Sequence, residues 1–123
     1  MAYESAHPFP LAHMVFFKLT DRSLPEATKF MDYCIRYLSG HPGQLHFSVG
    51  LRDVEISRDV SNTDFDVAMH IVFSSRDAYE GYAASPEHDE FIVETAGRSS
   101  ARQVCDSYLR YLSGEPGNFE ANK

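Results

Sequence analysis

The chain has 123 residues, which is the length of one domain and leaves no room for a second catalytic domain. Its 11 Lys and Arg residues and 18 Asp and Glu residues give a formal net charge of −7, which opposes binding to nucleic-acid phosphates and to anionic lipid. Apolar residues make up 43% and charged residues 24%, as in folded rather than disordered proteins. We therefore expect a folded domain with no nucleic-acid partner and no membrane partner.

Nothing in the first twelve residues predicts export. They lack the positive segment and the apolar run of a signal peptide, and Pro8 and Pro10 interrupt them. No apolar run in the chain approaches the roughly eighteen residues that cross a bilayer. Cys34 and Cys105 lie in periodic apolar segments, which predicts reduced thiols that pack as small apolar groups. We expect a cytoplasmic protein.

The first predicted elements are a strand and a helix. Residues 13–19 alternate with period two and are apolar on both faces, so this strand must be covered twice. Ser23 is a suitable N-cap for an amphipathic helix that runs to Leu38, before Gly40 ends it. One face of the strand carries His13, Val15, Phe17 and Leu19, and the other carries Met14 and Phe16.

Two further strands are predicted in the middle of the chain. Residues 44–56 are extended, with a bulge or bend expected at Gly50. Residues 57–64 are polar and predict a loop. Residues 65–73 have the clearest period-two pattern in the chain, which predicts a strand with one strongly apolar face.

A pair of short helices and a last strand follow. Residues 74–77 resemble a capping box and predict a helix that ends near residue 84. Ser85 and Pro86 are typical of a new N-cap and first turn, so a second helix is expected to about residue 95. Residues 102–112 alternate as a fourth strand.

This order predicts an α+β subunit with the ferredoxin-like split βαβ plan, in which a four-stranded antiparallel sheet carries helices on one face. The other face exposes Met14 and Phe16, and an apolar patch of this kind usually marks an interface. We expect a homodimer that packs sheet against sheet through these residues. Residues 1–12 are predicted to be a flexible arm, residues 13–112 the domain, and residues 113–123 a polar tail.

Several segments together resemble the stress-responsive A/B barrel domain family. The resemblance covers residues 13–112 and includes His13-Met-Val-Phe-Phe-Lys18 and the spacing Tyr82-x-x-x-Pro-x-His88. It implies a ferredoxin-like subunit that forms a dimeric α+β barrel. One plant member is a polyketide cyclase that closes a linear chain by an aldol step, with a Tyr and a His at positions matching Tyr82 and His88. This sequence departs from that cyclase at Cys34 and Ser85, where the cyclase has an aromatic hydroxyl and a histidine.

The residues themselves also suggest chemistry at this pair. His88 is expected in the first turn of a helix, where the positive end of the helix dipole disfavours the imidazolium and keeps a neutral base. Tyr82 offers a phenol that can hold a developing enolate, and His13 faces the same side of the sheet. The predicted pocket for a small apolar or aromatic molecule lies between helices and sheet, and its walls are Val15, Phe17, Phe30, Met31, Cys34 and Phe91.

Other interpretations of the same residues stay open. His88 can serve only to cap a helix and Tyr82 only to fill a gap, in a non-catalytic stress or assembly protein. A cofactor-free monooxygenase of the related barrel group needs a similar pocket and proton acceptor. The six histidines show no metal-binding spacing, and no glycine-rich turn or axial ligand indicates flavin or haem, so no metal and no cofactor is predicted.

Overall fold

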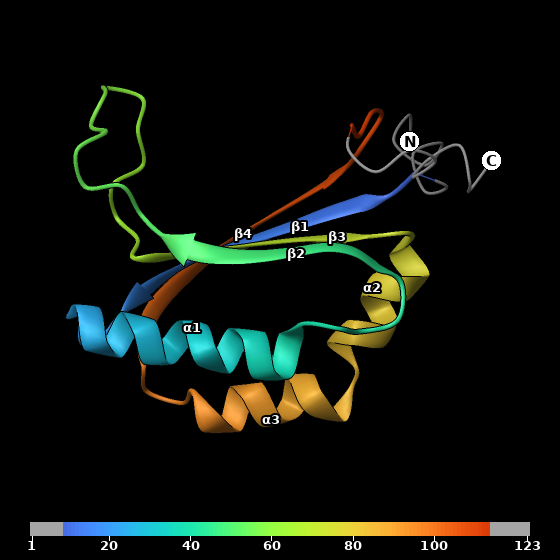
Figure 1. Ribbon diagram of the computed structural model, residues 1–123, viewed down its shortest axis with the longest axis horizontal. Coiled ribbons are helices and arrows are strands. Elements are labelled where there is room, and N and C mark those ends of the chain that lie inside the picture. Colours follow the sequence, from blue (N-terminus) through green and yellow to red (C-terminus); the bar gives the residue numbers. More distant parts are fainter. Residues whose placement is uncertain (1–8, 114–123) are drawn as a thin grey trace.

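The computed structural model describes residues 9–113, and they form one sheet with three helices on one of its faces (Figure 1). All neighbouring strands are antiparallel, in the order β2-β3-β1-β4. This arrangement confirms the predicted ferredoxin-like α+β fold. The elements in chain order are β1 (Leu11–Leu19), α1 (Leu24–Leu38), β2 (Gln44–Leu51), β3 (Val67–Phe73), α2 (Arg76–Ala83), α3 (Pro86–Glu94) and β4 (Ser99–Tyr108).

The ends of the strands differ from the predicted ones. β1 begins at Leu11 rather than at residue 13, because the Leu109 amide donates to the Pro10 carbonyl at 2.8 Å and the ladder starts directly after the proline. Leu11 and Ala12 are accordingly buried. β4 runs from Ser99 to Tyr108 instead of over residues 102–112. Residues 1–8 of the predicted arm and 114–123 of the predicted tail lie outside the described residues.

The irregularity of β2 lies at its start and not at Gly50. Gln44 pairs with Phe73, whereas His46 already pairs with Val72, so Leu45 is an extra residue opposite β3. Leu45 is exposed as a result. Gly50 pairs regularly with Ala68, and β2 ends at Leu51 rather than at residue 56. The bulge predicted at Gly50 was therefore wrong.

Serine hydroxyls start all three helices. Ser23 accepts from the Glu26 amide at the start of α1, and Ser85 accepts from the His88 amide at 3.1 Å at the start of α3, both as predicted. The cap of α2 is Ser75, whose hydroxyl accepts from the Ala78 amide at 3.1 Å. The predicted capping box therefore began one residue too early.

Gly43 fixes how the chain enters β2 beside α2. Its φ of +81° lies in the left-handed region, and a Cβ built on it lies 2.5 Å from the Ala78 Cβ. Its carbonyl accepts from the Ser74 amide at 2.7 Å. Only glycine satisfies both the backbone angle and this close approach.

The core lies between the sheet and the helices and is rich in aromatic rings. Phe17 of β1 packs edge-on against Phe30 of α1 with the ring centroids 4.8 Å apart, and Phe91 of α3 lies 5.9 Å from Phe30. Phe73 of β3 is completely buried. These contacts hold α1 and α3 on the sheet and leave α2 to close one end.

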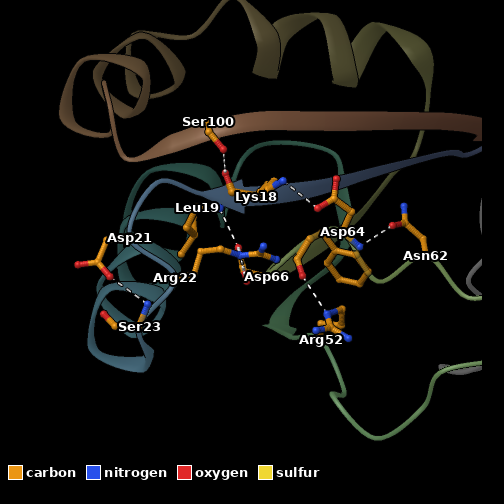
Figure 2. Close-up of polar contacts among 11 residues, drawn as sticks. Lys18, Leu19, Asp21, Arg22, Ser23, Arg52, Asn62, Asp64, Asp66 and Ser100 are labelled. Carbon is orange, nitrogen blue, oxygen red and sulfur yellow. Dashed lines mark hydrogen bonds and ion pairs between the residues drawn. The ribbon is translucent and has the colours of Figure 1, made fainter.

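A carboxylate fastens the end of β1 to the start of β3 (Figure 2). Asp66 accepts from the Leu19 amide at 2.8 Å and from Arg22 Nε at 3.0 Å, and its own amide donates to the Phe17 carbonyl at 2.8 Å. Lys18 forms a second ion pair nearby, with Asp64, at 2.9 Å. These contacts hold the end of β1 against the start of β3.

The face of the sheet away from the helices is only partly covered. Met14 and Phe16 are half-buried there, as is His70 on β3. The loop over residues 52–66 rises on this same side in Figure 1, and its Val60 is 86% exposed. No helix within residues 9–113 has the length and apolar character needed to span a membrane.

Candidate active site

β1 and β4 bring a histidine and a carboxylate together on the helix side of the sheet. His13 is opposite Asp106 in the ladder, and its Nδ1 lies 2.6 Å from the Asp106 Oδ1. His13 is buried, whereas the Asp106 side chain is 42% exposed. When Nδ1 donates to the carboxylate, Nε2 of the neutral ring carries the lone pair, so Asp106 selects the tautomer of His13.

Tyr82 lies at the centre of the site, in the last turn of α2. Its ring is 3% exposed and lies 5.1 Å from the ring of His88 and 6.0 Å from that of His13, measured between centroids. Burial raises the pKa of Tyr82 above its usual value, and the neighbouring Cys34 and Tyr79 raise it further. Tyr82 is therefore a protonated phenol, and within residues 9–113 its hydroxyl has no hydrogen-bond partner.

His88 is in the first turn of α3, where the Ser85 cap holds its backbone. Burial lowers the pKa of His88; the nearby Asp89 opposes this shift, and the electrostatic effects of Arg102 and of the neighbouring histidines add to it. The lowered pKa favours the expected neutral ring, and burial is the largest cause of the shift. In the described part of the chain the His88 ring has no hydrogen-bond partner.

A cavity of about 200 Å³ lies between the sheet and helices α2 and α3, and the three rings border it. Arg102 and Val104 of β4 border it and are exposed. The full lining consists of His13, Val15, Phe17, Leu38, Met69, Tyr79, Tyr82, Ala83, His88, Phe91, Ile92, Arg102 and Val104.

The predicted pocket residues separate into two groups. Val15, Phe17 and Phe91 line the cavity together with the three predicted catalytic residues. Phe30 and Cys34 are completely buried in the core and do not line it. Burial raises the pKa of the Cys34 thiol to about 12, so this cysteine packs as an apolar group. Met31 is partly buried against the core and is also absent from the lining. Cys105 was predicted to pack as a small apolar group like Cys34, but it is exposed.

Sequence reasoning missed Asp106, Tyr79 and Arg102. The alternation in the last strand places Asp106 and Arg102 on the same face as Val104. Charged residues at positions that face inward could therefore have indicated these two site residues from the sequence. Tyr79 lies one turn before Tyr82, with its ring 5.0 Å from that of His13. Burial, and next the charge of Asp106, raise the pKa of Tyr79.

A second, wider cavity of about 720 Å³ lies on the other side of Tyr82, between the end of α1 and the start of α3. His41 borders it, with its ring 5.0 Å from that of Tyr82 and its Nε2 2.8 Å from the Tyr37 carbonyl. Tyr82 is thus a wall shared by both cavities. Within residues 9–113 no group of three or more His, Cys, Asp or Glu side chains is placed to hold a metal ion.

A comparison with protein-family models matches residues 11–109 to the stress-responsive A/B barrel domain. The chain belongs to the stress-responsive A/B barrel domain family. This finding confirms the resemblance stated from the sequence, and the matched residues contain every strand and helix described above. A search of curated protein sequences found no match.

Solved structures share the fold at low sequence identity. A dimeric ferredoxin-like protein of unknown function from Thermobifida fusca is 15% identical, with a TM-score of 0.67 over 82% of this chain and 92% of its own. A hydroxynitrile lyase from Passiflora edulis is 16% identical, with a TM-score of 0.67 over 87% and 99% of the two chains. A variant of a cofactor-independent oxygenase from Streptomyces nogalater is 14% identical, with a TM-score of 0.64 over 84% and 95%. At these identities the likeness concerns the fold.

Proposed function

We propose that the cavity beside Tyr82 binds a small apolar or aromatic carbonyl compound and catalyses proton transfer at the carbon next to the carbonyl. The observation that carries this proposal is the meeting of a phenol donor and a neutral imidazole, Tyr82 and His88, with ring centroids 5.1 Å apart at a largely apolar cavity. Enolisation needs one base and one donor to the developing oxyanion. The pair provides both without a cofactor.

The proposed reaction moves one proton and one electron pair. The free ring nitrogen of His88 takes a proton from the carbon, and the electron pair of that C–H bond forms an enolate. Tyr82 donates a hydrogen bond to the enolate oxygen. In a cyclisation, the enolate carbon then attacks a second carbonyl of the same molecule, forming a C–C bond, and the resulting alkoxide takes the proton back from the His88 imidazolium.

The pair of His13 and Asp106 supports a second role in the same cavity. With Nδ1 donating to the carboxylate, Nε2 of His13 is an acceptor, and His13 and His88 line the same cavity. We infer that His13 relays a proton or orients the substrate. The carboxylate also stabilises a transient imidazolium by a charge-assisted hydrogen bond.

Hydrogen exchange at carbon tests the proton-transfer proposal without knowledge of the natural substrate. The α protons of phenylacetone in D₂O are followed by proton NMR at neutral pD. General-base catalysis typically contributes about 10²- to 10⁴-fold, so we expect H88Q to lose at least about 100-fold of the protein-dependent exchange rate. Y82F should lose a similar factor, with Y33F on α1, outside the cavity lining, as the control. Equal rates for wild type and H88Q would contradict the proposal.

Oxygenation is a second candidate reaction, supported by the shared fold with the cofactor-independent oxygenase. In this case the base takes the proton of a phenolic substrate, and the resulting carbanion gives two electrons to O₂ as the C–O bond forms. The peroxide anion that results takes the proton back from the base, which gives a hydroperoxide. An oxygen electrode separates the two reactions, because exchange and cyclisation consume no O₂.

We also infer that two copies associate through the open face of the sheet, which carries Met14 and Phe16. Both side chains are half-buried in a single copy although they are large and apolar. The loop on the same side exposes Val54 and Val60, by 75% and 86%, which favours a surface that a partner covers. The related fold from Thermobifida fusca is described as dimeric. Such packing leaves the cavity on the helix side of each subunit intact.

A further inference from the structure

On its helix side, β4 carries a cation, an apolar residue and a carboxylate in succession along the cavity. Arg102 is opposite Phe17, Val104 is opposite Val15, and Asp106 is opposite His13, all on the helix side of the sheet. Two-residue steps along a strand are about 6.7 Å, so Arg102 and Asp106 are separated by roughly 13 Å of strand. An apolar stretch at Val104 thus lies between a cation and the carboxylate that holds His13.

Arg102 has no partner for its charge in the described residues. Arg22 and Arg98 each contact a carboxylate, at 3.0 Å and 3.1 Å, whereas within residues 9–113 the exposed Arg102 has no ion pair or hydrogen bond to its guanidinium. The only carboxylate on the inner face of β4, Asp106, is bonded to His13 at the far end of the strand. An unpaired guanidinium beside an apolar cavity is suited to an anion supplied by a ligand.

We propose that the cavity selects an amphipathic carboxylate, with the carboxylate bound by Arg102 and an apolar or aromatic body lying along Val104. This inference rests on the proposed function, because it places the carbonyl of the same molecule beside Tyr82. The planar guanidinium fork matches the two oxygens of a carboxylate. An apolar cavity of about 150 Å³ holds a benzene ring, so the 200 Å³ found here accommodates one ring with a short chain.

Binding of a matched pair of probes tests the selectivity. Isothermal titration calorimetry compares 4-phenylbutanoate with 4-phenylbutanamide, which has the same body and no charge. We expect the wild-type protein to bind the carboxylate about 10- to 100-fold more tightly, as a hydrogen-bonded ion pair provides. R102Q should lose this preference, and its affinity for both probes should equal the affinity of the wild-type protein for the amide. R58Q removes the same charge from the exposed loop and should keep the preference.

Other variants separate this inference from the proposed reaction. H88Q should keep the carboxylate preference while it loses hydrogen exchange at carbon. If H88Q exchanges like wild type and R102Q still loses the preference, the proposed reaction fails and the selectivity stands. Equal binding of both probes by wild type, no binding of the carboxylate at millimolar concentration, or an unchanged preference in R102Q overturns the inference. If R102Q keeps the preference but no longer self-associates, Arg102 belongs to the subunit interface, and this result also overturns the inference.

Discussion

Phe16 and Phe17 are neighbours on β1 and show how differently the two faces of the sheet are used. Phe17 is 3% exposed and packs edge-on against Phe30 of α1. Phe16 points to the opposite face and contacts the ring of Phe65, with centroids 5.2 Å apart. The three helices of residues 9–113 all lie on the other face of the sheet (Figure 1). The same side chain thus completes a core on one face and remains available for a partner on the other. The polar groups of the candidate site lie on the covered face, where burial changes their acidity.

The largest effect is expected from truncation on the covered face. F17A removes a ring from a closely packed aromatic cluster and leaves a cavity, so the free energy of unfolding should fall by about 3–5 kcal/mol. Urea denaturation followed by circular dichroism measures this loss. F16A serves as the matched variant, and its smaller loss should depend on protein concentration. Equal, concentration-independent losses for both variants would contradict the difference between the two faces.

A charge on the open face should act on assembly rather than on folding. F16D places a carboxylate in the inferred subunit interface, and we expect the dimer dissociation constant to rise at least about 100-fold, or roughly 2.7 kcal/mol. Sedimentation velocity at micromolar concentration measures the fraction of monomer, and F16L is the conservative control. A wild-type chain that sediments as a monomer under these conditions contradicts the inferred dimer.

The caps that hold the helices on the covered face offer a finer test. S75A removes the hydroxyl that accepts from the Ala78 amide and should destabilise the protein by about 1 kcal/mol. S74A is the matched control, because the Ser74 hydroxyl does not cap α2, and its effect should remain below about 0.5 kcal/mol. Thermal unfolding of the two variants side by side decides whether Ser75 or Ser74 starts the helix.

The smallest effect is a change in the titration of His88. Burial and neighbouring positive charges lower its pKa, so its NMR signal should titrate below the usual value of about 6.5. R102Q removes one of those charges and should move the midpoint up, whereas D89N removes the opposing charge and should move it down. The unfolded chain binds this proton more readily, so this histidine lowers stability as the pH falls through that range. A midpoint above the usual value contradicts the buried, neutral ring.

The fold could be predicted because hydrophobic periodicity and turn residues agree along most of the chain. The alternation in residues 13–19 correctly separated Phe17 from Phe16, and Ser85 correctly marked the break between α2 and α3. Periodicity indicates which way a side chain points but not how deep it lies. For this reason Cys34, on the inner stripe of α1, was predicted in the pocket wall although it lies within the core.

The candidate site could be predicted only in part, since its groups come from distant segments. The spacing of Tyr82 and His88 is local, and the sequence indicated both. The partner of His13 is 93 residues away, and only the register between β1 and β4 brings Asp106 to it. The extra residue at Leu45 likewise depends on how β2 meets β3, which no local pattern in the sequence specifies.

The turn that precedes β4 governs the chemistry at the far end of that strand. Gly97 has a φ of +79°, and the neighbouring Arg98 binds Glu26 of α1 at 3.1 Å, so the strand enters the sheet at a defined point. A slip of two residues would keep the same side chains facing the helices but would put Val104 or Tyr108 opposite His13. A substitution in this remote turn would therefore separate His13 from Asp106 without unfolding the protein. In a screen for activity it would have the same effect as a substitution in the site itself.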